Sequence, residues 1–167
     1  YTYIDNIRFE EQLKTYPPDF FAYSVGTNDG NVPYSDFSPQ VYKHNLEKMM
    51  QMALRANPDC ALLLTVPNDS YYRRRYLNKN IARERDVIIE LAEEYNMAVW
   101  DLYGLMGGLG SSKTWRNNEL MRGDMIHFTF QGYHFKAELY VDALLKYMDQ
   151  FEDPELLRVR ILNKTEE

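Results

Sequence analysis

Hydrophobic and polar residues follow two patterns that alternate along the chain. Short, mostly apolar runs have the length and composition of strands buried on both faces, and they occupy residues 20–25, 61–66 and 97–103. Longer segments repeat their apolar residues at helical spacing, and they cover approximately residues 6–16, 38–56, 80–95 and 129–151. Strands that alternate with helices in this way predict an α/β fold, a three-layer α/β/α sandwich around a parallel sheet.

The ends and faces of the helical segments can also be predicted. Asn6 and Thr129 are placed to cap the first and last helices, and Ser38 followed by Pro39 opens the second. The apolar spacing predicts inward-facing residues in three helices, namely Tyr42, Leu46, Met49, Met50 and Ala53 in the second, Ile81, Ile88, Leu91, Ala92 and Tyr95 in the third, and Ala137, Tyr140, Leu144, Met148 and Phe151 in the last.

The remaining segments are predicted to be loops and a tail. Residues 67–76 are mostly polar and residues 104–123 are rich in glycine, so we expect neither to contain helix or strand. We expect residues 1–151 to form one domain and the charged residues 152–167 to form a tail or an edge segment. Because functional loops follow the carboxyl ends of parallel strands, the polar loops should meet at one rim of the sheet.

Composition narrows the possible classes of function. The chain has 167 residues and a formal net charge of −6, whereas general binding of nucleic acid needs a basic face. A single cysteine excludes an internal disulfide, and no apolar stretch approaches the ~20 residues of a membrane span. The three histidines, His44, His127 and His134, lack a metal-ligand spacing. We therefore expect no metal, no cofactor, no nucleic acid and no membrane span.

Asp124 and His127 form the most informative pair in the chain, because a three-residue offset across a tight turn can bring their side chains together. In such a pair the carboxylate accepts a hydrogen bond from one ring nitrogen and leaves the other nitrogen free to act as a base. The same spacing also arises by chance. The alternative is an exposed aspartate and a partly buried histidine ahead of a helix cap.

A second polar motif, Gly26-Thr27-Asn28-Asp29, follows the first apolar run. Glycine permits a sharp turn at this point. The Asn28 amide can then donate a hydrogen bond to a developing oxyanion, an interaction that stabilises a transition state by roughly 2.7–4 kcal/mol. The alternative is structural, because Asn28 and Asp29 can simply build an Asx turn.

Together, the two motifs resemble those of the SGNH, or GDSL-type, hydrolase family. The resemblance implies that Asn28 is an oxyanion-hole donor, Asp124 the orienting acid and His127 the general base of an esterase. The glycine-rich stretch over 107–111 and Trp115 are similar to those of bacterial carbohydrate esterases, including peptidoglycan O-acetylesterases. This kinship implies an extracytoplasmic setting and a small acyl ester or an acylated glycan as the substrate.

The resemblance covers about residues 1–150, but it lacks two of the family's blocks. The nucleophilic serine of the family lies in a Gly-Asp-Ser block, and another block supplies a glycine to the oxyanion hole; neither is found in this chain. We therefore expect the chain to be the carboxy-terminal part of a Ser-His-Asp esterase, and to self-associate or to pair with an upstream segment that carries the serine. The chain's own serines lack the strand-to-helix elbow of a nucleophile, and those considered are Ser24, Ser38, Ser70, Ser111 and Ser112.

Three residues are candidates for contact with the substrate. Trp115 can stack on a sugar ring or pack its own loop down, and Tyr72 and Arg73 can grip an anionic glycan or belong to a solvated loop. Two other interpretations remain open. One is a non-catalytic glycan-binding or truncated, inactive module that uses these three residues. The other is a doubly wound domain of another family, in which the acid–histidine pair would lie apart from Asn28.

Overall fold

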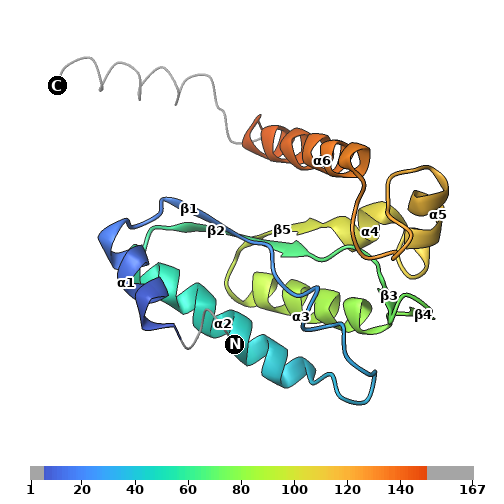
Figure 1. The fold of residues 1–167 in the computed structure, drawn as a ribbon. Helices are drawn as coiled ribbons and strands as arrows, with labels where there is room; N and C mark the ends of the chain where they lie inside the picture. The colour runs from blue at the N-terminus through green and yellow to red at the C-terminus, as the bar shows by residue number, and fades with distance from the viewer. Residues whose placement is uncertain (1–5, 150–167) are drawn as a thin grey trace.

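The computed structural model describes residues 6–149, and a sheet of three parallel strands lies at its centre (Figure 1). The strands lie in the order β1 (Phe20–Tyr23), β2 (Ala61–Val66) and β5 (Ala98–Asp101). Tyr23 pairs with Leu64, and Thr65 pairs with Trp100, so the three strands run in one direction and end at the same edge. The predicted parallel sheet is confirmed.

Two helices cover one face of this sheet, and a third packs beside them. These are α2 (Pro39–Ala56), α3 (Asn80–Glu94) and α1 (Ile7–Thr15), the last of which contacts α2. The Ser38 hydroxyl accepts a hydrogen bond from the Val41 N–H at 3.3 Å, and the Asn6 side chain accepts one from the Arg8 N–H at 3.1 Å. Both predicted caps are thus confirmed. The predicted inward stripes of α2 and α3 are confirmed too, with Tyr95 only partly buried.

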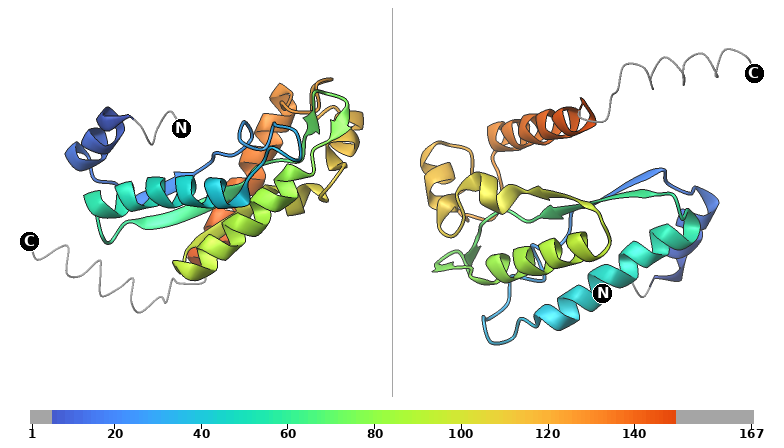
Figure 2. Two further views of the ribbon diagram at one scale, coloured as in Figure 1. Left: turned by 90° about the horizontal axis from the view of Figure 1, so that it is seen from below. Right: turned by 180° about the vertical axis from the view of Figure 1, so that it is seen from behind.

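Helix α6 (Phe130–Asp149) lies on the opposite face, so the sheet is enclosed between two helical layers (Figures 1 and 2). Leu63 and Trp100 point to this side, and the Trp100 ring meets the Tyr140 ring edge-on with 5.0 Å between their centroids. The Thr129 hydroxyl accepts a hydrogen bond from the Gly132 N–H at 3.1 Å, which confirms the third cap. The α/β architecture with a parallel sheet flanked by helices is therefore confirmed.

Strand β1 is buried on one face only, which corrects the prediction for residues 20–25. Tyr23 is buried against the α2–α3 layer, whereas Phe20 is 47% exposed and Ala22 is also exposed. Ala22 pairs with Leu63 of β2, so the two residues share a face. Helix α6 packs over Leu63, but within the described residues no element buries Ala22. The apolar composition of β1 therefore does not correspond to burial on both sides.

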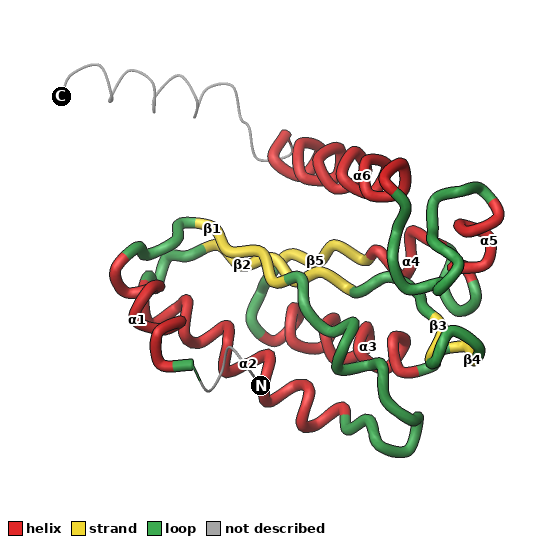
Figure 3. Tube along the Cα trace, in the orientation of Figure 1, coloured by secondary structure: helices red, strands yellow, loops and turns green. Residues whose placement is uncertain are grey.

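Two segments predicted as loops contain regular structure, as Figure 3 shows. The additional elements are α4 (Leu102–Met106), α5 (Ser111–Asn117), β3 (Tyr71–Tyr72) and β4 (Tyr76–Leu77). The last strand also ends earlier than predicted, because the Asp101 carboxylate accepts a hydrogen bond from the Gly104 N–H at 2.9 Å and starts α4 directly. Helices and strands this short contain too few apolar repeats to produce a periodic pattern.

The inward face of α6 differs in part from the prediction. Tyr140 packs on the sheet as predicted, but it is joined by Leu139 and Ala143. Ala137 and Met148, which were expected to face inward, are exposed. The physical reason is that α6 contacts the sheet through the stripe of Leu139, Tyr140 and Ala143. Met148 lies about two turns beyond Tyr140 and Ala137 three residues before it, and both are outside this stripe.

The predictions for Phe151 and for the tail over 152–167 fall outside the described residues. In the part of the chain that the structure describes, no helix is both long enough and apolar enough to cross a membrane.

Candidate active site

The turn from Asp124 to His127 places a carboxylate against an imidazole. Asp124 Oδ2 lies 2.9 Å from His127 Nδ1. Asp124 Oδ1 accepts hydrogen bonds from the backbone N–H groups of Ile126 at 2.9 Å and His127 at 3.0 Å. Met125 has a φ of 54°, a left-handed conformation that lets the backbone curl around the carboxylate. Both carboxylate oxygens are therefore engaged by the turn itself.

These contacts hold Asp124 in its ionised form. Partial burial acts to raise the pKa of this carboxyl, but the hydrogen bonds from His127 and Ile126 outweigh burial and lower the pKa to about 2. An ionised carboxylate can only accept, so Nδ1 of His127 carries the proton and Nε2 presents its lone pair. The His127 side chain is 58% exposed, which leaves Nε2 accessible. This is the geometry that a general base and its orienting acid require.

The segments on both sides of the turn are fixed to the core. Phe128 is buried, and it forms an isolated bridge with Met121, which closes the loop that contains the turn. The start of α6 approaches Leu120 so closely that a methyl group on Gly132 would lie 1.8 Å from the Leu120 carbonyl oxygen. Only glycine fits at this position, and its small size sets the distance between α6 and the loop.

Hydrogen bonds tie the turn to the loop that follows β2. The Asn68 side-chain amide donates to the Ile126 carbonyl oxygen at 3.2 Å, and the Tyr71 N–H donates to the Met125 carbonyl oxygen at 3.1 Å. Asn68 itself is buried, so its side chain is fixed in place. The acid–histidine turn therefore lies at the carboxyl end of β2.

Further hydrogen bonds connect the β2 loop, through the start of α3, to the loop that follows β1. The Asn78 amide donates to the Ser70 hydroxyl at 3.1 Å. The Asn80 amide donates to the carbonyl oxygens of Gly30 at 3.1 Å and Val32 at 3.0 Å. The three loops thus form one hydrogen-bonded series along an edge of the sheet. Sequence analysis missed these asparagines, although an Asn-Lys-Asn sequence at the start of a helix was a usable signal.

Asn28 lies in this series, on the loop after β1. The Gly30 N–H donates to the Gly26 carbonyl oxygen at 2.9 Å, which closes the loop with Asn28 in its middle. The Asn28 side chain is exposed and has no hydrogen-bond partner among the described residues. Together with residues of α2, it lines a cavity of about 670 Å³. The Asn28 amide is therefore available to a ligand oxygen.

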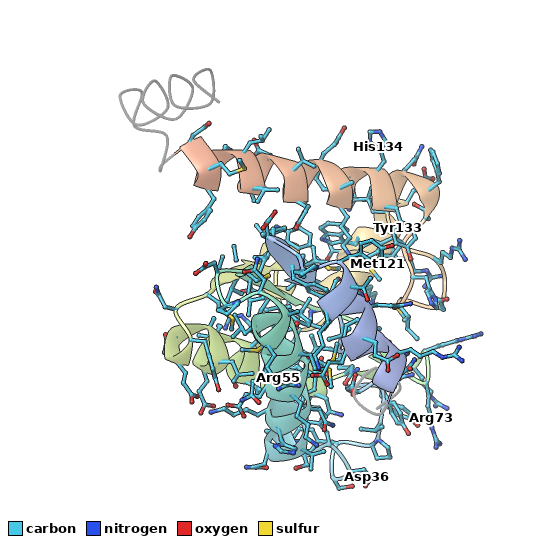
Figure 4. All side chains as sticks on the ribbon, turned by 90° about the vertical axis from the view of Figure 1, so that its left-hand side faces the viewer. Asp36, Arg55, Arg73, Met121, Tyr133 and His134 are labelled. Carbon is cyan, nitrogen blue, oxygen red and sulfur yellow. The ribbon has the colours of Figure 1, made fainter. Side chains whose placement is uncertain are left out.

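Tyr72 and Arg73 belong to the β3–β4 hairpin. Arg73 and Arg74 have φ values of 51° and 59°, conformations that glycine and asparagine adopt more readily. The Arg73 guanidinium lies 5.3 Å from the centroid of the Tyr72 ring, and Arg75 lies 5.6 Å from that of Tyr76. Arg73 is exposed at the periphery of the molecule (Figure 4). Because β3 is bonded to the acid–histidine turn, these cations lie on the same rim as the candidate base.

Trp115 lies inside the second apolar cluster. It is 8% exposed, its ring packs against those of Phe128 and Phe135, and its Nε1 donates to the Met106 carbonyl oxygen at 3.3 Å. A ring with so little exposed surface has no open face to offer a sugar. The structure therefore fits the packing alternative for Trp115 rather than the stacking one.

His134 is separate from the candidate site. It lies on the outward face of α6 and pairs with Glu138 at 3.2 Å (Figure 4). Among residues 6–149, no three histidine, cysteine or acidic side chains are arranged to hold a metal ion.

The model of the GDSL-like lipase/acylhydrolase family matches residues 2–135, which is more than half of the chain. The chain belongs to this family. One similar solved structure is that of a peptidoglycan O-acetylesterase, whose sequence is 18% identical to this chain. The two align with a TM-score of 0.77 over 87% of this chain and 42% of that chain. The lipase/acylhydrolase from Enterococcus faecalis is 22% identical, with a TM-score of 0.62 over 82% of this chain and 66% of that one. At these identities the likeness shows the fold alone. The comparison with curated proteins gave no match.

Three serines near the acid–histidine turn of this GDSL-like chain are buried, whereas Ser24, which lines the cavity beside Asn28, is exposed. Ser112 is fully buried, and its hydroxyl donates to Asp69 Oδ2 at 2.7 Å. The buried Ser70 hydroxyl accepts a hydrogen bond from an asparagine amide, and Ser111 is buried as well. A nucleophile must reach both the ester and Nε2 of His127. In these positions, the three serines are closed off from an ester substrate.

Because its pKa is lowered, Asp124 should stabilise the folded state above about pH 4, and this contribution should be lost as the pH falls through about 2. We expect the difference in free energy of unfolding between the wild type and Asp124→Asn to shrink as the pH falls from about 4 through about 2. Urea unfolding measures it, with Asp59→Asn as a control for the loss of an exposed carboxylate. A difference independent of pH would contradict the assigned hydrogen bonds.

Proposed function

We propose that the protein hydrolyses the ester bond of an acylated carbohydrate, with His127 as general base, Asp124 as its orienting acid and Asn28 as a donor in the oxyanion hole. The observation that carries the proposal is the 2.9 Å contact between Asp124 Oδ2 and His127 Nδ1, which leaves Nε2 exposed. Membership of the GDSL-like family supports ester hydrolysis. The carbohydrate is suggested by the likeness to a peptidoglycan O-acetylesterase.

The proposed reaction has two halves. A serine hydroxyl attacks the ester carbonyl carbon while its proton passes to Nε2 of His127. The negative charge that develops on the carbonyl oxygen is stabilised by the Asn28 amide N–H. When the intermediate collapses, the imidazolium returns the proton to the departing sugar oxygen. Water then attacks the acyl-enzyme by the same route and releases the carboxylic acid. Asp124 stabilises the imidazolium in both halves.

In this proposal the nucleophilic serine belongs to a segment outside these 167 residues. The chain spans 42% of the peptidoglycan O-acetylesterase that it matches, so the activity is proposed for the complete protein. A nucleophile from another segment is consistent with the burial of Ser70, Ser111 and Ser112. The cavity of about 670 Å³ beside Asn28 is lined by the loop after β1 and by α2, not by Asp124 or His127, so it offers space for the substrate's carbonyl oxygen beside the Asn28 amide.

The alternative of a non-catalytic glycan-binding module depended on Trp115 together with Tyr72 and Arg73. Because Trp115 is buried, only the two hairpin residues remain as candidate glycan contacts. Glycan binding alone also gives no reason for an ionised carboxylate that orients an exposed imidazole. We therefore favour hydrolysis, and we propose that the Tyr72–Arg73 hairpin binds an anionic part of the glycan.

Replacement of the base should nearly abolish turnover in the complete protein. We expect His127→Ala to lower kcat for p-nitrophenyl acetate roughly 10⁴- to 10⁶-fold, since the members of a triad act as a unit. Asn28→Ala should lower kcat roughly 10²- to 10³-fold through the loss of one oxyanion donor. The matched controls are His134→Ala on the outward face of α6 and Asn31→Ala in the same loop as Asn28. Near-full turnover by His127→Ala would show that the base has been misassigned.

The β3–β4 hairpin should affect the binding of negatively charged substrates only. We expect Arg73→Ala to raise KM for an O-acetylated glycan that carries carboxylates by roughly tenfold, the loss of one charge-assisted hydrogen bond. KM for neutral p-nitrophenyl acetate should not change. Lys48→Ala removes an exposed cation from α2 and serves as the control. An equal effect of Arg73→Ala on both substrates would contradict a glycan-binding role for the hairpin.

A further inference from the structure

Glu84 is a buried acid for which the catalytic proposal gives no role. It lies in the middle of α3 and is 0% exposed, and among the described residues neither carboxyl oxygen makes a hydrogen bond of good geometry. The backbone N–H of Gly30 faces the carboxyl and acts to lower its pKa, but less strongly than burial acts to raise it. Burial of a carboxyl group without a partner is unfavourable, so such a residue requires an explanation. Its position in sequence follows the inward stripe of α3, three residues after Ile81 and four before Ile88.

The backbone of the Asn28 loop is packed directly on this carboxyl. A methyl group on Gly30 would lie 2.7 Å from Glu84 Oε1, and one on Gly26 would lie 3.2 Å from Glu84 Oε2 and 2.7 Å from the Tyr42 hydroxyl oxygen. Gly26 and Gly30 are the two ends of the loop, and the hydrogen bond between them closes it around Asn28. The absence of side chains at both ends thus lets the loop rest on Glu84.

Two other titratable groups face Glu84, namely Asp29 from the loop and Tyr42 from α2. Burial first, and then the negative charge of Asp29, raise the pKa of Glu84 to about 9. Burial first, and then Glu84, likewise raise the pKa of Tyr42. At neutral pH, therefore, Glu84 and Tyr42 are both uncharged beneath the loop. Ionisation of Glu84 would place a second negative charge beside Asp29.

We propose that neutral Glu84 is a positioning residue for the oxyanion hole, which supports the loop over residues 26–30 from below and so aims the Asn28 amide. This role rests on the proposed function of Asn28. The packing of the loop over residues 26–30 on Glu84 does not depend on whether the protein is an esterase. Loss of the Glu84 proton should shift the loop and impair the oxyanion donor without altering His127.

The test is carbon-detected NMR of the complete protein between about pH 6 and about pH 10, on the wild type, Glu84→Gln and Glu93→Gln. Glutamine has nearly the size and shape of neutral glutamic acid but cannot ionise. Glu93 is an exposed acid on the same helix, so Glu93→Gln serves as the control. In the wild type and in Glu93→Gln, the Cα signals of Gly26 and Gly30 should titrate with the Glu84 carboxyl, at a midpoint near 9. In Glu84→Gln this step should be absent.

Kinetics add a readout that depends on catalysis. In the wild type, kcat should fall about tenfold per pH unit above the same midpoint while KM stays constant, and Glu84→Gln should remove this alkaline limb. Glycine signals that do not move with Glu84, or that titrate equally in Glu84→Gln, would overturn the proposal. If wild-type protein shows no esterase activity, the catalytic proposal fails, and the NMR titration still decides the role of Glu84. If the fall in kcat at high pH persists in Glu84→Gln, that result would also overturn the proposed role of Glu84.

Discussion

Three hydrogen bonds converge on the Asp124 carboxylate, and the geometry of the candidate site depends on them. Two come from backbone N–H groups of the turn and one from the ring of His127. The same side chain thus shapes the turn, selects the tautomer of the imidazole and supplies the charge that an imidazolium requires. Because the carboxylate is used in all three ways, the position of His127 and its chemistry cannot be changed independently.

The parallel sheet supplies the frame in which this turn can serve catalysis. All three strands end at one edge, and asparagine side chains join the successive loops there, from Gly30 through the start of α3 to Ile126. Asn28 and His127 lie at the two ends of this series, at positions far apart in the chain. Apolar clusters pack against both faces of the sheet, whereas the exposed face of β1 and the hairpin arginines lie outside these clusters.

Features that depend on short-range sequence could be predicted. The strand runs, the caps at Asn6, Ser38 and Thr129, and the pairing of Asp124 with a histidine three residues away all follow from local spacing. Other features required long-range packing. The bond from Asn68 to Ile126 joins residues 58 apart, and the burial of Trp115 depends on rings from α6 and the preceding loop. Helices α4 and α5 are too short for periodicity to be detected.

Whether His127 serves a serine from outside these 167 residues is tested most directly by labelling the complete protein with a serine-directed fluorophosphonate. Peptide mass spectrometry then locates the adduct. We predict a single adduct on a serine outside this chain, formed in the wild type and absent in His127→Ala, and no labelling of residues 1–167 expressed alone. An adduct on any serine of these 167 residues, the exposed Ser24 included, or labelling that persists without the His127 imidazole, would contradict this assignment.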